Sequence, residues 1–412
     1  MNRKLLLFPT LLMGIAASAQ THVTLQLSSK VTQDDAPVVL DLAKYGDIQS
    51  ALVTVDGEET PCQLDDLDRD GTFDELAFLT SFSKKGRKTA VVTLYADGTP
   101  RSYPARTFAE IVLGNPKVKE KNKHNIYLSA ITLTRETPDQ YHVLHHHGVA
   151  FENELVAMRI YMDQRQTVDL YGKYHKGLEL HDTQFYTSAA QKAQGYGDDV
   201  LWVGNTFGLG ALRGWDGNAP TMLSDVESRT QRIVAQGPVR TIVEMEDYRW
   251  TPAPGMRPVN MTVRYTLYAG HRDCDVTATF SRDMSASEFS TGIINVKNST
   301  EFTDHAGLRG CWGTDWPATD TLNWKRETVG LGIYVPAAYK VREVGANKDN
   351  YAFVVRPVGK TLRYSLAYCS DNENFGYHSA SDWFAFLKEW KKRVDNPVVV
   401  KETEAQLINL CF

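Results

Sequence analysis

The sequence predicts an all-β protein, in which a small N-terminal β-sandwich precedes a large antiparallel β-supersandwich with one C-terminal helix. Short segments rich in β-branched residues recur along almost the whole chain, and no alternating helix pattern accompanies them. The length of 412 residues also exceeds what one hydrophobic core usually organises. We therefore expect a small domain over residues 20–100 and a large domain over residues 101–412.

Residues 1–19 have the order of features of a secretory signal peptide. Asn2-Arg-Lys4 precedes an apolar run from Leu5 to Ala17, and small residues lead up to Gln20. We expect cleavage near Ala19 and a periplasmic or secreted product. No cysteine lies near this position and no later apolar run is long enough to span a bilayer, so neither a lipid anchor there nor a membrane span is expected.

Charge and cysteine content exclude some classes of function. The formal net charge of -5, from 45 basic and 50 acidic residues, provides no basic field for nucleic acid. The five cysteines show no CxxC pair and no metal-type spacing. One disulfide could form in an oxidising compartment, but the spacing does not choose a pair.

The expected strands alternate apolar and polar residues and are separated by turn residues. A segment with two prolines and a glycine, Asp97–Pro104, is the expected linker between the domains. In the small domain the strands are expected at Thr21–Leu27, Val38–Leu42, Ala51–Val55, Glu75–Leu79 and Thr89–Tyr95. In the large domain they include Ile126–Thr134, Arg240–Glu246, Val259–Tyr268, Cys274–Phe280, Leu331–Val335, Tyr351–Val355 and Leu362–Tyr368.

One helix is expected near the C-terminus. Ser379 to Asp382 resembles the start of a capping box, and Lys391 to Arg393 would lie at the favourable C-terminal end of the helix. An apolar stripe predicts that this helix packs on the sandwich; it comprises Trp383, Phe384, Phe386, Leu387 and Trp390.

Three histidines and two glutamates gather between His145 and Glu154, where they could bind a metal or transfer protons. In a strand His145 and His147 would share one face, so at most two of the three could enter one pocket. Glu152 and Glu154 would also point the same way. Spacing fixes no third metal ligand, and exposed or backbone-bonded histidines are the plain structural alternative.

The strands that follow extend the polar surface. Arg159, Tyr161 and Asp163 should share one face of a strand, and Asp169, Tyr171 and Lys173 one face of the next. Such groups offer bidentate hydrogen bonds to a polyhydroxylated, anionic ligand, so a sugar is the first candidate. Four aromatic residues are candidate stacking platforms, although aromatic residues of a β-sandwich more often lie in the core: Tyr186, Trp202, Trp215 and Trp250.

The segment from Asp66 to Glu75 resembles the first half of a calcium loop. Carboxylates occupy relative positions 1, 3, 5 and 9, from Asp66, Asp68, Asp70 and Asp74, and Gly71 occupies position 6. The closing glutamate is absent. An Asp-rich turn that bonds its own backbone is therefore the alternative to a structural calcium site.

Several motifs together are similar to those of the exported bacterial family catalogued as domain of unknown function 4861. They are HHHGVAFENELVAMRIYMD at 145–163, TVDLYGK at 167–173, GYGDDVLWVGNTFGLGALRGWDG at 195–217 and SDWFAFLKEW at 381–390. This resemblance implies a galactose mutarotase-like supersandwich and a role in glycan utilisation. The family pattern maps onto His147, Gly148, Glu152, Asn153, Arg159, Tyr161, Asp169, Gly172, Lys173 and Asp199. Val149 stands where the family pattern has proline.

The leading hypothesis is a lyase or glycosidase that acts on an oligosaccharide or polysaccharide fragment containing uronic acid. A sugar mutarotase or epimerase and a noncatalytic glycan-binding protein are the alternatives. The expected catalytic residues are His146, His147, Glu152 and Tyr161. The expected substrate-binding residues are Asn153, Glu154, Arg159, Asp169, Lys173, Tyr186 and Trp215.

Overall fold

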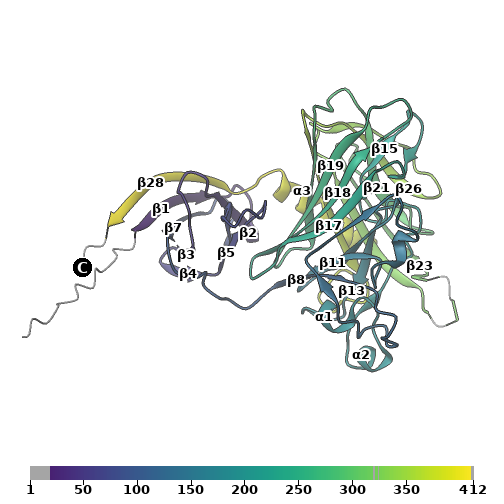
Figure 1. The fold of residues 1–412 in the computed structure, drawn as a ribbon, viewed down its shortest axis with the longest axis horizontal. Coiled ribbons are helices and arrows are strands. Elements are labelled where there is room, and N and C mark those ends of the chain that lie inside the picture. The colour runs from purple at the N-terminus through teal and green to yellow at the C-terminus, as the bar shows by residue number, and fades with distance from the viewer. Residues whose placement is uncertain (1–18, 319–320, 323, 410–412) are drawn as a thin grey trace, which may run out of the picture.

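Two β-rich domains lie beside each other in the computed structural model, which describes residues 19–318, 321–322 and 324–409 (Figure 1). The predicted all-β class is confirmed, since antiparallel strands form five sheets and helices are few. The predicted signal peptide lies outside the described residues except for Ala19, which begins the first strand.

The small domain packs a five-stranded sheet against a three-stranded one around a core that includes Val23, Val53, Phe78 and Val92. The five-stranded sheet has the order β28-β1-β7-β3-β4 and the other has the order β2-β6-β5. Their strands are β1 (Ala19–Ser28), β2 (Gln33–Asp41), β3 (Ser50–Val55), β4 (Glu58–Thr60), β5 (Cys62–Asp65), β6 (Glu75–Phe82), β7 (Arg87–Tyr95) and β28 (Val399–Asn409).

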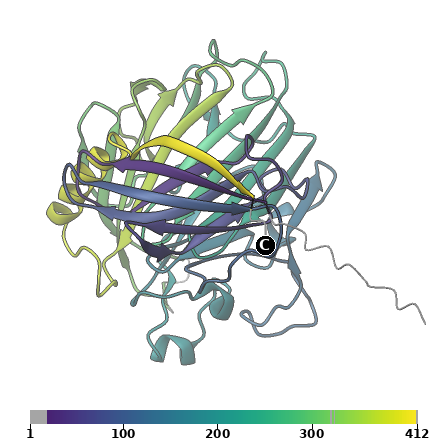
Figure 2. The ribbon, with the colours of Figure 1, turned by 90° about the vertical axis from the view of Figure 1, so that its left-hand side faces the viewer.

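The last strand of the chain belongs to the small domain. β28 pairs antiparallel with β1 from Val399 opposite Ser28 to Asn409 opposite Ala19, and it forms the edge of the five-stranded sheet (Figure 2). The predicted boundary between residues 100 and 101 assigned the residues of β28 to the large domain and did not anticipate that they pair with β1. A strand pairing between the two ends of a chain leaves no local pattern in the sequence.

A nine-stranded sheet forms one layer of the large domain. Alternation in its strand β19 buries Val263, Tyr265 and Leu267, whereas Arg264 and Thr266 are on the opposite face. The sheet runs β10 (Ala130–Thr134), β17 (Ser228–Ala235), β18 (Arg240–Trp250), β19 (Val259–Tyr268), β20 (Asp273–Phe280), β27 (Thr361–Ser370), β24 (Glu327–Tyr334), β23 (Leu308–Asp315) and β22 (Thr300–Thr303).

Two smaller sheets form the second layer, and residues of all three sheets share one core. The six-stranded sheet runs β14 (Asp198–Asp199), β13 (Val168–Gly172), β12 (Ala157–Tyr161), β11 (Gly148–Asn153), β8 (Thr107–Val112) and β9 (Tyr127–Leu128). The five-stranded sheet runs β16 (Pro220–Thr221), β15 (Arg213–Trp215), β21 (Phe289–Ile294), β26 (Asn350–Val355) and β25 (Lys340–Glu343).

The predicted C-terminal helix is confirmed as α3 (Ala380–Val394), with Ser379 accepting a hydrogen bond from the backbone N–H of Asp382. Its buried Trp383, Leu387 and Trp390 pack on β23 and β24. Two short helices, α1 (Leu180–Thr183) and α2 (Ala189–Ala193), and a 3-10 turn at Gln140–His142 were not predicted. Among the helices that the structure describes, none combines the length and apolar character that a membrane crossing requires.

Buried polar contacts join the two domains. Arg240 at the start of β18 is almost fully buried and donates to Asp65 (2.7 Å) and Glu75 (2.6 Å) of the small domain. The side chain of Gln63 bonds the backbone of Val239 and Arg240. Because these buried hydrogen bonds cross the boundary, they hold the domains at a defined orientation.

The four cysteines that the structure describes are all buried and free: Cys62, Cys274, Cys311 and Cys369. The fifth, Cys411, lies outside the described residues.

Candidate functional site

The residues predicted for the site lie mainly on the outer face of the six-stranded sheet, where they form a polar layer. Arg159 on β12 is directly opposite Asp169 on β13 in the register. Leu180 and Phe185 of the segment that carries α1 pack over this face with Ala150, Ala157 and Tyr171. The covering segment explains why a layer of charged side chains is buried.

Arg159 is the centre of this layer. Its guanidinium donates to Asp169 (2.6 Å) and Asp199 (3.0 Å) and lies 4.1 Å from the centroid of the Phe185 ring. Tyr161 also donates to Asp169, at 2.8 Å. Arg159 is 4% exposed, so its charge is used within the layer and a substrate carboxylate could reach it only after the covering segment moved.

His147 is fixed at the edge of the polar layer. Its backbone is left-handed (φ 72°), and the next residue must be glycine because a Cβ on Gly148 would lie 1.6 Å from the carbonyl oxygen of Ile160. Nδ1 donates to the carbonyl oxygen of Tyr141 (3.0 Å), so Nε2 accepts from the Tyr186 hydroxyl (2.9 Å). Burial and then the charge of Arg159 lower the His147 pKa to about 3, which keeps the ring neutral.

Glu152 and Lys173 form a fully buried ion pair of 2.5 Å between Oε2 and Nζ. The carboxylate also accepts from the backbone N–H groups of Glu179 and Leu180, and the ammonium donates to the carbonyl of Asn153. These bonds tie the start of α1 to the sheet. In this structure neither side chain faces solvent, so the pair holds the covering segment in place.

Asn153 ends β11 and Glu154 begins the turn that follows, next to the small domain. The Asn153 side chain donates to the carbonyls of Tyr268 and His271, both at 2.6 Å. Glu154 pairs with Arg106, which also bonds Asp35 of the small domain. Glu152 and Glu154 therefore have separate partners and do not act as one carboxylate pair.

The predicted aromatic platforms lie apart from one another. Trp215 on β15 and Trp250 on β18 are buried, whereas Trp202 is 54% exposed. Tyr186 is half-buried, and its hydroxyl is bonded to His147. Of these four, only Tyr186 joins the polar layer.

His146 points to a different partner, Glu110 on β8. Nε2 of His146 lies 3.1 Å from Oε1 of Glu110, and both side chains are at most 1% exposed. Burial first, and then the charge of Glu152, raise the pKa of Glu110 well above its usual range. Burial and the charge of Arg159 lower the pKa of His146 to about 3. The two groups therefore form a neutral pair in which the carboxyl group keeps its proton.

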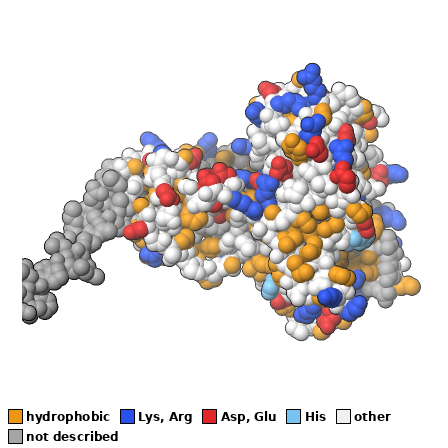
Figure 3. Space-filling view, viewed as in Figure 1, with side chains coloured by type: hydrophobic (Ala, Val, Ile, Leu, Met, Phe, Trp, Pro, Cys, Tyr) orange, Lys and Arg blue, Asp and Glu red, His pale blue; other side chains and the backbone are white. Residues whose placement is uncertain are grey.

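Glu110 lies in the wall of a cavity of about 530 Å³, here called the aromatic pocket. The rings of Phe108 and Tyr127 lie 5.7 and 6.0 Å from that of His181 on α1. Figure 3 shows apolar side chains gathered in this part of the large domain. The pocket is lined by residues 108–111, 127–129 and 233–236 together with His181.

A larger hollow of about 1010 Å³, here called the interdomain groove, lies between the small domain and the outer face of the nine-stranded sheet. Charged side chains of both signs gather where the domains meet (Figure 3). Its arginines are Arg69, Arg232, Arg240, Arg264 and Arg363, its acids are Asp68, Glu75, Glu244 and Asp275, and its threonines are Thr230, Thr262, Thr266, Thr277 and Thr279.

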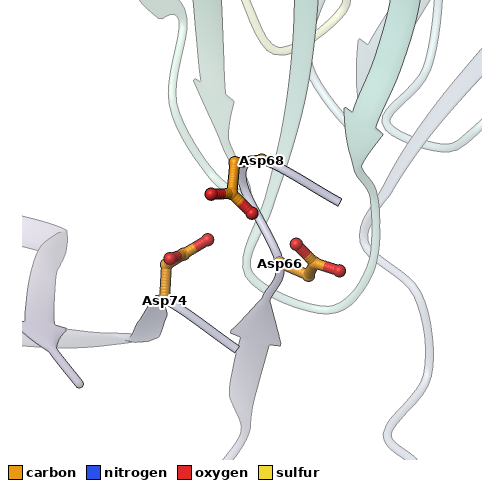
Figure 4. Close-up of side chains that lie close together, drawn as sticks. All are labelled: Asp66, Asp68 and Asp74. Carbon is orange, nitrogen blue, oxygen red and sulfur yellow. The ribbon is translucent and has the colours of Figure 1, made fainter. Parts of the chain in front are cut away.

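The predicted calcium loop reaches the edge of this groove. One carboxylate oxygen each of Asp66, Asp68 and Asp74 lies within 4.8 Å of the others (Figure 4), and Asp70 is not in this group. The loop also bonds its own backbone, because Asp66 accepts from the N–H groups of Arg69 and Gly71. The alternative of an Asp-rich turn is thus observed, and the calcium site stays a prediction.

Glu110 and the groove residues other than Asp68, which was predicted as a calcium ligand, were missed by sequence reasoning. A single acid within the otherwise apolar run Phe108–Val112 was the available signal for Glu110, because a buried charge requires a partner. In the predicted strand Val259–Tyr268, the polar residues that alternate with the apolar ones, Thr262, Arg264 and Thr266, were the available signal for the groove.

Comparisons with known proteins give the following relationships. The profile of the family described as "Domain of unknown function (DUF4861)" matches residues 26–400. No curated protein matches. Among solved structures, a glycosyl hydrolase family 38 protein and an alpha-mannosidase, both from Enterococcus faecalis, each align at 10% identity with a TM-score of 0.45. Each alignment covers 93% of this chain but only 47% and 46% of those chains, respectively, so this chain spans less than half of their length.

Proposed function

The chain belongs to the family described as domain of unknown function 4861, and because that description states no reaction, we propose a function from the geometry of the surface. The protein is a carbohydrate-active enzyme that binds a uronic-acid-containing oligosaccharide in the interdomain groove and cleaves it as a lyase or a glycosidase. The observation that carries this proposal is the set of guanidinium and hydroxyl groups that line the groove.

The groove suits an acidic, hydroxyl-rich chain for two reasons. Arg232 pairs with Glu244 and Glu246, and Arg264 pairs with Glu244, so both guanidinium groups are held in place at the groove. The exposed guanidinium of Arg363 makes no side-chain hydrogen bond or ion pair with any residue that the structure describes, and its charge acts on Asp275: burial raises the pKa of Asp275 to about 6, and the charge of Arg363 acts against that rise. A free guanidinium beside ordered ones can take a carboxylate, and the threonine hydroxyls can both donate to and accept from sugar hydroxyls.

The proposal is tested by binding and turnover on oligogalacturonate, ulvan and glucuronoxylan oligosaccharides, with neutral xylo-oligosaccharides as the comparison. Reducing ends and the ultraviolet absorbance of an unsaturated product distinguish hydrolysis from elimination. Arg363→Ala should weaken binding of the acidic probes about tenfold or more, because a charged hydrogen bond is lost. Arg257→Ala, an exposed arginine outside the groove, is the matched control.

The same experiment separates the alternatives. Equal binding of neutral and acidic probes would contradict the assignment of a uronic acid. Tight binding with no turnover would identify a noncatalytic glycan-binding protein, and accelerated anomeric exchange of free sugars by NMR would identify a mutarotase. The mutarotase-like character of the large domain, export of the chain and the catalytic roles of His147 and Tyr161 stay predictions.

A further inference from the structure

We propose that the aromatic pocket binds a sugar ring of the oligosaccharide at its cleavage point and that Glu110 is the proton donor to the departing oxygen, with His146 as its positioning residue. This inference rests on the proposed function, because it places the reaction at one end of the same bound chain. It adds a catalytic residue and a ring-binding pocket.

The first support is the form of the pocket. Its volume of about 530 Å³ lies in the range of small-ligand sites, and its walls are mainly apolar with few polar groups. Tyr127 is 44% exposed and holds its position because its hydroxyl accepts from the Gln184 side chain at 3.0 Å. The faces of Phe108, Tyr127 and His181 provide flat surfaces for a pyranose ring.

The second support is a buried polar atom without a partner. Oε2 of Glu110 makes no hydrogen bond within the described part of the chain, although the carboxyl group is 1% exposed and lies in the pocket wall. A buried carboxyl oxygen without a partner costs free energy, so its persistence favours a role with a ligand. When His146 donates from Nε2 to Oε1, the acidic proton lies on Oε2, the oxygen left to meet the ligand.

The charged groups around Glu110 agree with a neutral acid. Burial has the largest effect and raises the pKa of Glu110, the charge of Glu152 raises it further, and the charge of His181 lowers it. The other titratable side chains beside Glu110 are those of Tyr127 and His146. Lys173 forms its ion pair with Glu152 and not with Glu110. A carboxyl group that stays protonated at neutral pH can donate where an ordinary glutamate cannot.

Glu110 would give its proton to the departing oxygen in both candidate reactions. The bond from the sugar carbon to the departing oxygen breaks, its electron pair stays on that oxygen, and the proton of Glu110 moves to it. In hydrolysis a water molecule adds its hydroxyl to the anomeric carbon, and its remaining proton restores Glu110. In elimination the departing oxygen leaves C4, the electrons of the C5–H bond form the new C4–C5 double bond, and the C5 proton moves to Glu110 as that residue gives its own proton to the departing oxygen.

The aromatic pocket and the interdomain groove adjoin along β17 and the strand edge beside it. On β17, Arg232 faces the groove and the next residue, Ile233, faces the opposite side of the strand, toward the pocket; beside them, Ala130 lines the groove and Ser129 lines the pocket. Arg69 of the small domain lines the groove and donates to the carbonyls of Ser129 and Ile233. To place its terminal ring in the pocket, an oligosaccharide held in the groove must pass around this edge, where Arg69 bonds the backbone.

The test compares the full-length wild type with Glu110→Gln, using the oligosaccharide panel above and aryl glucuronides with good leaving groups. Glu110→Gln should lower turnover of oligosaccharides at least a hundredfold, while binding changes less than threefold. If the reaction is hydrolysis, activity on aryl glucuronides with the most acidic leaving groups should be largely retained, because those groups leave the anomeric carbon without a proton donor. Glu389→Gln on the exposed face of α3 is the matched control.

A second measurement needs no substrate. Infrared spectra at neutral pH should show a protonated carboxyl band in the wild type that is missing in Glu110→Gln. Equal turnover of oligosaccharides by both proteins, or absence of that band, would overturn the role of Glu110 and leave the proposed function intact. If the wild type turns over none of the probes, the proposed function is overturned, and this inference falls with it.

Discussion

At the scale of single residues, Glu110 should make stability depend on pH. The unfolded chain loses this proton near pH 4.5, but the folded protein keeps it to a much higher pH. The folded state then binds more protons, so the free energy of unfolding falls as pH rises above about 4.5. Glu110→Gln removes this fall, which amounts to at most about 1.4 kcal/mol per pH unit.

Urea unfolding of Glu110→Gln and the wild type at several pH values between 5 and 8 would measure the effect. The variant should gain stability relative to the wild type as pH increases across this range. If the free energies of unfolding of the two proteins changed in parallel with pH, Glu110 would release its proton at the same pH in the folded and the unfolded protein. Glu389→Gln, which changes an exposed carboxylate, should follow the wild type.

The Glu152–Lys173 pair allows a second prediction at this scale. Lys173→Met should lower the free energy of unfolding by about 3–5 kcal/mol, because it leaves a carboxylate buried without its cation. Adding Glu152→Gln should recover a large part of the loss. A double-mutant cycle by urea unfolding measures this coupling, and additive losses would contradict it.

Residue-scale features were only partly predictable from the sequence. The His145–Glu154 segment did identify the neighbourhood, since His146 bonds Glu110 and His147 bonds Tyr186. Alternation could not show that Glu152 would be covered by α1, because the covering segment is packed by contacts distant in sequence. Which polar residues face solvent is decided by that packing.

At the scale of elements, α3 is held against two glycines of the nine-stranded sheet. A Cβ at Gly332 on β24 would lie 2.4 Å from Leu387, and one at Gly310 on β23 would lie 2.3 Å from the same side chain. The glycines thus let the helix approach the strands closely. The helix itself was predictable because its cap and apolar stripe are local, whereas the glycine contacts are not.

This close approach predicts a coupled pair of substitutions. Leu387→Ala should lower the free energy of unfolding by about 3 kcal/mol through lost burial and a cavity. Gly332→Ala should destabilise the wild type by about 1–3 kcal/mol through overpacking, but much less in the Leu387→Ala background. Thermal and urea unfolding of the four proteins would test this, and an equal cost of Gly332→Ala in both backgrounds would contradict it.

At the scale of the whole molecule, Arg240 should couple the unfolding of the two domains. Arg240→Met leaves Asp65 buried without a cation and removes the bond to Glu75, at an expected cost of about 3–5 kcal/mol. Calorimetry should show one main transition in the wild type and two resolved transitions in the variant. Arg257→Met is the control, and a single unchanged transition in both variants would contradict the coupling.

The fold class was predictable because strand alternation recurs throughout the chain, but the assignment of strands to sheets was not. The pairing of β1 with β28 joins residues almost 400 positions apart. Propensity and alternation carry no information on such pairings, and the same is true of the interdomain groove, whose walls come from β2, the loop before β6, β6, β10, β17–β20 and β27.

The position of β28 has a consequence for the order in which the protein is made. Synthesis proceeds from the N-terminus, so β1, β3 and β7 exist long before the strand that completes their sheet. Until β28 emerges, β1 has an open edge at which another chain can pair. The large domain can complete its own sheets in that interval, and the small domain closes last.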